Sequence, residues 1–252
     1  MSIPELRPYQ IDVIAEFHSR VESGCRRIIL VAPTGSGKTI IGAEIIREKA
    51  RARKPVLVLA HRREMITQTS EKLHNLGIVH GIIQAGFPAR PLEDVQVASI
   101  QTLHRRAIRA ETMHLPPADL LVIDEAHHCP ANTYSKIIAS YPEAILLGLT
   151  ATPCRGDGRG LGGIFEIIIE CPQVAPLIEQ GFLVKTRVYA PVNPDLTGVR
   201  IQAGDYVETQ LADRMDRPKL IGDIAHALAQ VWRAPEVGGL HRQRLAFGPS
   251  AG

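Results

Sequence analysis

The sequence Ala32-Pro33-Thr34-Gly35-Ser36-Gly37-Lys38-Thr39 directly follows the apolar run at residues 28–31. A strand that leads into a glycine-rich turn and then into a helix exposes several backbone N–H groups to a bound phosphate. Gly35 and Gly37 lack a Cβ, so the backbone can adopt positive φ angles there and approach phosphate oxygens closely. The segment therefore predicts a nucleotide-binding site.

The polar residues at the end of this segment have distinct expected roles. The ammonium of Lys38 is expected to contact the β- and γ-phosphates, and the hydroxyl of Thr39 to hold Mg²⁺. The usual pattern begins with Gly where this chain has Ala32, a departure that affects only the first turn of the loop. A strand-turn-helix connection that merely contains Gly-Lys-Thr is the alternative. The apolar helical pattern at residues 40–46 favours the nucleotide site instead.

Composition places the chain among ordinary globular proteins. Of its 252 residues, 45% are hydrophobic and 22% are charged, and the formal net charge is +3. This charge is too small to indicate a nucleic-acid partner, so that argument depends on local arginine clusters.

Four widely spaced cysteines without a Cys-x-x-Cys pair indicate neither a zinc site nor a disulfide framework. The first residues show no signal-peptide pattern, and no apolar run is long enough to span a membrane. We therefore expect a cytoplasmic location.

Three further apolar runs are typical of buried strands, at residues 56–60, 120–123 and 144–149. Amphipathic segments that we expect to be helices lie between the strand at residues 28–31 and the strand at residues 120–123, at residues 40–46, 65–75 and 102–109. Continuous apolar strands that alternate with helices predict an α/β fold, with a mostly parallel sheet and helices on both faces. Such sheets bind ligands at the carboxyl ends of their strands. The polar residues that follow these strands are therefore candidate site residues.

The remaining segments complete the expected order of elements. Helices are expected at residues 11–23, 65–75, 102–109, 174–181, 206–215 and 218–232. Shorter strands are expected at residues 79–83, 95–98, 164–169 and 182–190. Residues 154–163 are rich in glycine and arginine and are expected to form a flexible loop, and residues 191–198 a linker.

Asp124 and Glu125 follow the strand at residues 120–123, 86 residues after Lys38. Because a hard cation prefers oxygen ligands, Asp124 is expected to hold Mg²⁺ directly or through water. Glu125 is expected to position and deprotonate the water that attacks a γ-phosphoryl group. An exposed acidic turn is the alternative for any Asp-Glu pair. The complete phosphate-binding segment upstream favours the catalytic interpretation.

Six segments occur in the order and approximate spacing of the first RecA-like domain of superfamily 2 helicases. They are residues 6–10, 32–39, 59–64, 98–103, 124–127 and 150–153. Over residues 1–190 the chain thus resembles a RecA-like P-loop NTPase domain of the DEAH-box type. Residues 152–161 and 177–183 also resemble RadD-type DNA repair helicases and the helicase (res) subunits of type III restriction enzymes.

The resemblance implies roles for the residues of the nucleotide site. Gln10 would recognise adenine. Contacts with the phosphates and Mg²⁺ are implied for Pro33, Thr34, Gly35, Ser36, Gly37, Lys38, Thr39 and Asp124. Catalysis would depend on Lys38, Asp124, Glu125 and His127. His127 would also couple this site to a partner domain or to the segment at Thr150. An additional metal site at residues 127–129 is disfavoured, because adjacent side chains point in different directions.

The resemblance also implies residues that bind nucleic acid. Thr150 and Thr152 would relay the nucleotide state to the grip on the nucleic acid. Contacts with the phosphate backbone of one strand are implied for His61, Arg62, Arg63, Ser99, Gln101 and Thr102. These contacts would position the strand without reading its bases, so binding should depend on salt. A structural histidine at a strand end is the alternative for His61.

The function that the resemblance implies is the ATP-binding domain of an ATP-dependent DNA helicase or translocase. Its domains would be a RecA-like domain at residues 1–190, linker and helices at 191–232, and a poorly ordered tail at 233–252. No segment of residues 191–252 resembles the Gln-x-x-Gly-Arg-x-x-Arg motif of a second RecA-like domain, which supplies arginine fingers. We therefore expect ATP binding with little hydrolysis, and no unwinding, by this chain alone.

Two alternative functions stay open. One is a non-catalytic module that binds ATP and nucleic acid. The other is a small-molecule kinase, for which the segments at Ser99 and Thr150 would have no purpose. DNA is preferred over RNA only through the RadD-like residues 152–161.

Overall fold

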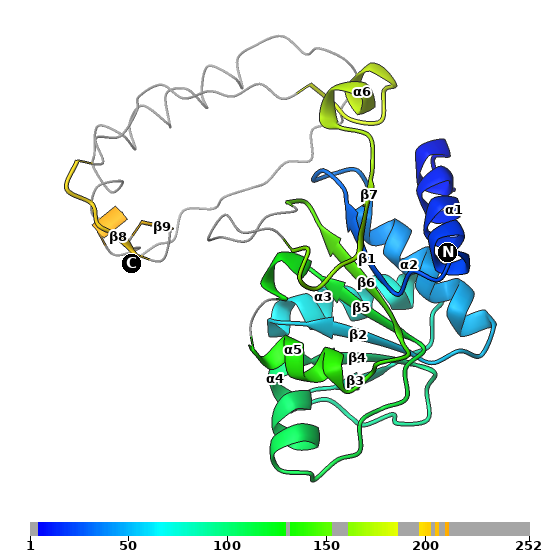
Figure 1. Cartoon of the computed structure of the whole chain (residues 1–252), viewed down its shortest axis with the longest axis vertical. Coiled ribbons are helices and arrows are strands. Elements are labelled where there is room, and N and C mark those ends of the chain that lie inside the picture. Colours follow the sequence, from blue (N-terminus) through cyan, green and yellow to red (C-terminus); the bar gives the residue numbers. More distant parts are fainter. Residues whose placement is uncertain are drawn as a thin grey trace, which may run out of the picture. The chain divides into compact units, whose positions relative to one another are not determined.

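The computed structural model describes residues 5–129, 132–152, 161–185, 197–202, 205–206 and 210–211. Contacts divide the chain into two units, Met1–Lys185 and Thr186–Gly252. The first unit contains a seven-stranded sheet in the order β3-β4-β2-β5-β6-β1-β7, and its neighbouring strands are all parallel (Figure 1). Its strands are β1 (Arg27–Val31), β2 (Val56–Ala60), β3 (Gly81–Ile83), β4 (Val95–Ser99), β5 (Leu120–Asp124), β6 (Ile145–Thr150) and β7 (Ile167–Glu170).

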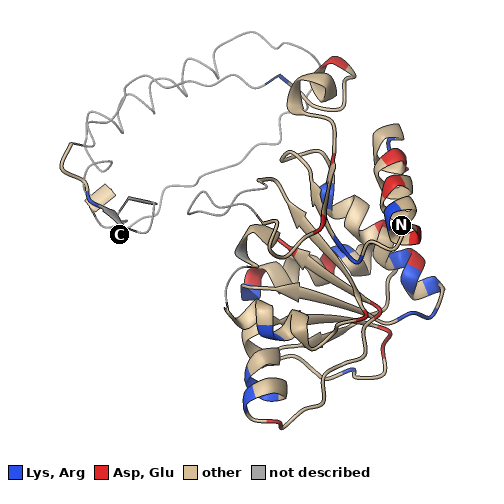
Figure 2. Ribbon diagram, in the orientation of Figure 1, with Lys and Arg blue, Asp and Glu red and all other residues tan. Residues whose placement is uncertain are grey.

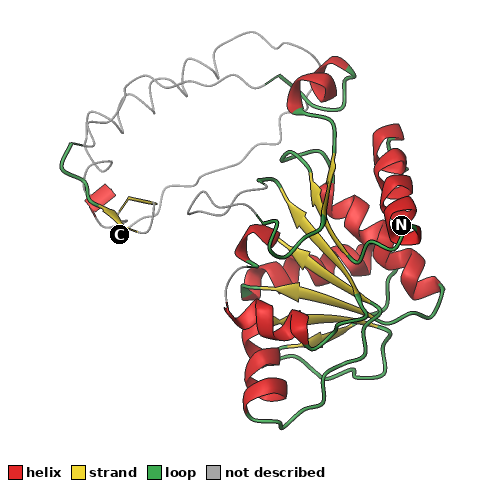
Figure 3. Cartoon of the chain, viewed as in Figure 1, coloured by secondary structure: helices red, strands yellow, loops and turns green. Residues whose placement is uncertain are grey.

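Helices cover both faces of this sheet (Figure 3). One face packs against α1 (Pro8–Glu22), α2 (Lys38–Arg51) and α3 (Arg63–Asn75). The other packs against α4 (Ile100–Leu103) and α5 (Asn132–Ala139). Short helical turns follow α4 at His104–Arg109 and β5 at Ala126–His128, and α6 (Val174–Glu179) follows β7. The expected α/β fold with a parallel sheet between helices is confirmed.

The two faces of the sheet hold separate apolar clusters. Ile28 and Leu30 belong to the same cluster as Phe17 of α1, whereas Ile29 between them belongs to the cluster of Tyr134 of α5. Successive strand residues point to opposite faces, so a strand buried on both sides must be apolar throughout. In Figure 2, accordingly, the charged residues lie mainly on helices and loops rather than on strands. Burying one Leu or Ile side chain fully favours folding by about 1.5–3 kcal/mol relative to leaving it exposed.

The helix expected at residues 102–109 begins earlier and changes its geometry. Ser99 Oγ accepts a hydrogen bond from the Thr102 N–H at 3.3 Å and caps the helix, so α4 starts at Ile100. Residues His104–Arg109 then form a wider π-helical turn. Helix α5 was not expected from the sequence, although Tyr134, Ile137 and Ile138 have helical spacing and are buried.

The strand expected at residues 182–190 is wrong for residues 182–185. The amides of Gly181 and Phe182 donate to the carbonyls of Ile178 and Leu177, which closes the C-terminus of α6 with a glycine-dependent cap. Gly181 has a φ of 76°, as this cap requires. Phe182 then packs on Tyr9, with ring centroids 5.4 Å apart, instead of entering the sheet. Residues 186–190 lie outside the described part.

In the second unit, β8 (Ile201–Gln202) pairs with β9 (Asp205–Tyr206) in antiparallel fashion. The helix expected from Tyr206 therefore does not begin at that residue. The other expectations for residues 191–196 and 212–252, and the loop at residues 154–160, lie outside the described residues. Within the described ranges, no helix is long and apolar enough to cross a membrane.

Candidate nucleotide site and nucleic-acid surface

Three neighbouring strands bring the nucleotide-site candidates to one edge of the sheet. β6 lies between β1 and β5, with Val31 opposite Thr150 and Asp124 opposite Leu149. The chain leaves β1 into the phosphate-binding segment, and it leaves β5 and β6 at Asp124 and Thr150. Parallel strands end at the same edge of a sheet, so all three polar segments meet there.

The phosphate-binding segment has the backbone geometry that its glycines predict. Gly35 and Gly37 have φ angles of 83° and 84°. Gly37 is also the N-cap of α2, and its carbonyl accepts from the amides of Ile40 and Ile41. The first N–H groups of this helix have no partners within the helix itself and are suited to bind an anion. Thr34 is exposed and Ser36 is buried, with its hydroxyl donating to the Pro33 carbonyl at 2.7 Å.

Helix α1 holds this segment in place through Gln10. The Gln10 side-chain amide donates to the Ser36 carbonyl at 3.1 Å and accepts from the Arg7 N–H at 3.0 Å. The Tyr9 hydroxyl donates to the same Ser36 carbonyl. A Cβ on Gly37 would displace the Gln10 amide from its position, in addition to the strain that the positive φ would impose on another residue. Gln10 therefore braces the phosphate-binding segment, and its adenine contact stays a prediction.

The structure brings Lys38, Asp124 and Glu125 together. Lys38 Nζ lies 3.0 Å from Glu125 Oε1 and 4.0 Å from Asp124 Oδ1. Glu125 has a φ of 53°, a left-handed conformation that is unusual for a residue other than glycine and is often found at functional sites. Burial raises the pKa of Asp124 above its usual range, although the nearby Lys38 opposes this shift. The two carboxylates thus face the phosphate-binding lysine.

Thr39 and Asp124 carry side-chain oxygen atoms of the kind that ligate Mg²⁺, and the magnesium role expected for them stays a prediction. Both line one small cavity of about 20 Å³, whose other lining residues are apolar apart from Thr69 and Lys72. Mg²⁺ is usually held by one or two protein oxygens, with water and phosphate oxygens completing the octahedron. Lys72 of α3 lines the same cavity, and its ammonium donates to Thr39 Oγ1 at 3.5 Å. Sequence analysis missed Lys72, because one lysine on an amphipathic helix carries no signal of this contact.

His127 connects the segment after β5 to the segment after β6. Its Nδ1 lies 3.2 Å from Thr150 Oγ1 and 3.4 Å from Glu125 Oε2. Thr150 Oγ1 in turn donates to the Thr152 carbonyl at 2.8 Å and accepts from the Thr152 N–H at 3.2 Å. These contacts form a continuous path from Glu125 to Thr152. Pro153 lies outside the described residues.

The candidates for nucleic-acid contacts gather at the ends of β2 and β4, which are paired with Ala60 opposite Ser99. Gln101 connects them, because its amide donates to His61 Nδ1 at 3.0 Å and accepts from Ser99 Oγ at 3.1 Å. Ser99 and Thr102 are only 5% and 8% exposed, so they support the surface from within.

His61, Arg62 and Arg63 are exposed on this surface. The guanidinium of Arg63 also lies over the ring of Phe87, 5.6 Å from its centroid. Sequence analysis did not identify Phe87 as part of this surface, since it is distant in the chain. The structure therefore places Arg62 and Arg63 at the surface, and Ser99 and Thr102 buried behind it with Ser99 linked to His61 through Gln101.

Comparisons with known proteins agree with this geometry. The family described as type III restriction enzyme, res subunit, matches residues 3–155. A putative ATP-dependent helicase of Saccharomyces cerevisiae is 29% identical over 87% of this chain and 34% of its own length. A DNA 3'-5' translocase of Sulfurisphaera tokodaii is 33% identical over 62% of this chain and 32% of its own length. The chain thus spans about a third of the length of these relatives.

Among solved structures, the helicase domain of Pyrococcus furiosus Hef has the same fold, with a TM-score of 0.54 and 23% identity. The match covers 69% of this chain and 39% of that one. Fold, strand-end residues and family match agree, and the chain belongs to the type III restriction enzyme res subunit family, in which it forms a first RecA-like domain of the superfamily 2 helicase type.

Proposed function

We propose that this chain is the ATP-binding part of an ATP-dependent DNA helicase or translocase. The observation that carries the proposal is the position of Glu125, which lies 3.0 Å from Lys38 at the mouth of the phosphate-binding segment. A carboxylate in this position can orient a water molecule toward a γ-phosphate that Lys38 and the first amides of α2 hold. The relatives named as an ATP-dependent helicase and a DNA translocase support this assignment.

Each residue of the site has a role in the proposed reaction. Lys38 neutralises phosphate charge, and Glu125 accepts a proton from the attacking water. Bound Mg²⁺, for which Thr39 and Asp124 fit as ligands, would supply further charge neutralisation. His127, through its contact with Thr150, would carry the state of Glu125 toward Thr152.

The nucleic-acid part of the proposal rests on the exposed His61, Arg62 and Arg63. The guanidinium charges of Arg62 and Arg63 are suited to phosphate groups rather than to bases, which predicts salt-dependent and sequence-tolerant binding. We propose DNA as the polymer, with DNA repair and a cytoplasmic location as the finer assignment. A second RecA-like domain would supply the arginine fingers, each of which can raise the rate about 10³- to 10⁵-fold.

The test is ATP binding and hydrolysis by the 252-residue chain, with and without single-stranded DNA. We expect ATP binding with slow turnover, and we expect Glu125→Gln to abolish turnover while ATP still binds. Glu143→Gln, at an exposed carboxylate, is the matched control and should leave both unchanged. Hydrolysis by Glu125→Gln at the wild-type rate would contradict the catalytic role. Binding without any turnover, even after a second RecA-like domain is added, would indicate a non-catalytic module.

A further inference from the structure

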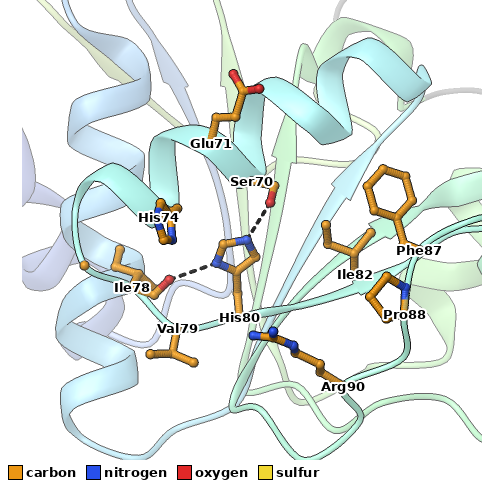
Figure 4. Close-up of a pocket in the computed structure, with 11 residues that line it drawn as sticks. Ser70, Glu71, His74, Ile78, Val79, His80, Ile82, Phe87, Pro88 and Arg90 are labelled. Atoms are coloured by element: carbon orange, nitrogen blue, oxygen red, sulfur yellow. Dashed lines mark hydrogen bonds between the residues drawn. The ribbon is translucent and has the colours of Figure 1, made fainter.

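A second hollow lies outside the nucleotide site, between α3, the connection from α3 to β3, β3 itself and the loop after β3 (Figure 4). It is a cavity of about 580 Å³, a size that accommodates a small organic ligand. The polar and charged residues that line it are Ser70, Glu71, His74, His80 and Arg90, and Ile82 and Phe87 add apolar surface. Glu71 is the one carboxylate among these lining residues, and the phosphate proposed below would lie at Arg90. Nothing in the proposed ATP reaction uses this cavity.

One wall of the cavity is held by a hydrogen-bonded chain. His80 Nδ1 lies 2.8 Å from the Ile78 carbonyl, and His80 Nε2 lies 2.7 Å from Ser70 Oγ (Figure 4). A carbonyl oxygen only accepts, so Nδ1 carries a hydrogen, and Nε2 of a neutral His80 accepts from the Ser70 hydroxyl. These two hydrogen bonds join α3 to the connection that follows it. This wall is therefore built before any ligand arrives.

The other residues offer an apolar surface and a positive charge. Ile82, Phe87 and Pro88 line the cavity with a flat ring and aliphatic carbons. Arg90 is exposed, and within the described part of the chain its guanidinium makes neither a hydrogen bond nor an ion pair. An aromatic surface beside a cation suits a ligand that combines a planar ring with an anion. A nucleotide has both groups.

The cavity also adjoins the exposed arginines of the candidate nucleic-acid surface. Phe87 lines the cavity and lies beneath the guanidinium of Arg63, which begins α3. His61 and Arg62 directly precede Arg63 in the chain. A nucleic-acid strand bound to these residues would have its next nucleotide close to Phe87.

We infer that this cavity binds a single nucleotide, with its base against Phe87 and Ile82 and its phosphate at Arg90. The nucleotide comes either from a bound single strand or from free solution. The strand source rests on the nucleic-acid binding proposed above, whereas the free-nucleotide source does not. The inference differs from phosphate-backbone contact at His61, Arg62 and Arg63, because it includes the base.

The experiment places the fluorescent base 2-aminopurine at successive positions of a short single-stranded DNA and titrates each oligonucleotide with the full chain. 2-Aminopurine deoxynucleoside monophosphate, titrated without ATP into the Lys38→Ala chain so that the phosphate-binding segment contributes little binding, serves as the free-nucleotide probe. The variants are Phe87→Leu, which keeps an apolar side chain, and Arg90→Gln. Arg51→Gln is the matched control, at an exposed arginine near the end of α2.

For a strand nucleotide we expect one labelled position to change its fluorescence on binding. Phe87→Leu should weaken binding about fivefold or more, since base stacking on an aromatic ring is lost. Arg90→Gln should make the negative slope of log affinity against log salt concentration less steep by roughly 0.7, the value for one lost phosphate contact on a single strand. Phe87→Leu should leave that slope unchanged, and Arg51→Gln should change neither quantity. A response of the monophosphate that Phe87→Leu removes would support the free-nucleotide source.

The inference is overturned if neither Phe87→Leu nor Arg90→Gln changes the binding of the labelled oligonucleotide or of the labelled monophosphate. If the oligonucleotide still binds and the Arg62 and Arg63 variants weaken it, the proposed function stands and only the nucleotide cavity is rejected. If no oligonucleotide binds, the DNA part of the proposed function fails, and the monophosphate titration alone decides the cavity. Thermal unfolding of Phe87→Leu checks its fold, and the exposed Arg90→Gln provides an independent measurement.

Discussion

The two halves of the carboxyl edge of the sheet are built differently. At the ends of β1, β5 and β6, Lys38, Asp124 and Glu125 are partly buried and paired with one another. At the ends of β2 and β4, the cations of Arg62 and Arg63 are exposed, and hydrogen bonds beneath them involve uncharged groups. The first half is arranged before its ligand binds, and the second presents solvated charge.

This difference follows from the two ligands expected there. A triphosphate has fixed dimensions, so a backbone cradle and an ion-paired lysine can match it in advance. A nucleic-acid strand offers evenly spaced phosphates, and exposed arginines bind it mainly by displacing counterions. Binding at the first half should thus depend on individual residues, and binding at the second on total charge.

The largest expected effect is that of Lys38→Ala on ATP affinity. It removes a charge-assisted contact worth about 1.5–3 kcal/mol, which corresponds to a loss of affinity of roughly 10- to 150-fold. Titration with a fluorescent ATP analogue measures the affinity, with Lys54→Ala as the control at an exposed lysine. Equal affinity of Lys38→Ala and wild type would show that the site at the ends of β1, β5 and β6 does not bind the triphosphate.

A smaller effect is expected for the double variant Arg62→Gln, Arg63→Gln. Its affinity for single-stranded DNA should fall about tenfold for all sequences. The negative slope of log affinity against log salt concentration should become less steep by roughly 1.4, as for two lost phosphate contacts. Fluorescence anisotropy at several salt concentrations measures both quantities. ATP affinity should stay unchanged. A loss confined to one DNA sequence would mean that the arginines at the ends of β2 and β4 read bases and not only phosphates.

The smallest expected effect concerns stability, through Asp124→Asn. Burial raises the pKa of Asp124, so the folded chain binds more protons than the unfolded chain between the unfolded value of 3.8 and the raised folded value. The contribution of this carboxyl to stability therefore falls as pH rises through the folded pKa. Asp124→Asn should be more stable than wild type at pH 7, and the difference should shrink toward pH 4.

Urea unfolding at the two pH values measures this difference, with Asp12→Asn as the control at an exposed position of α1. A variant that is less stable than wild type at pH 7 would show that the ion pair with Lys38 outweighs the cost of burial. The Asp124 carboxylate would then stabilise the folded chain.

Most of the fold could be predicted from the sequence because its signals are local. The runs that became β1, β2, β5 and β6 are apolar throughout, as a sheet buried on both faces requires. The missed helix α5 has such a signal too, in the spacing of Tyr134 and Ile137. The expected strand from Phe182 failed because Gly181 closes α6 and directs Phe182 onto Tyr9, a contact between distant segments.

By itself, the sequence determined the α/β class, the phosphate-binding segment and the candidate residues at the strand ends, since glycines, apolar runs and strand-end carboxylates act where they stand in the chain. Only the tertiary structure decided that Gln10 braces Ser36, that Lys72 reaches Thr39 and that Arg63 covers Phe87. These contacts join residues far apart in the sequence, and they arise from how helices pack on the sheet. No local pattern encodes that packing, because it depends on which side chains the whole core brings within reach.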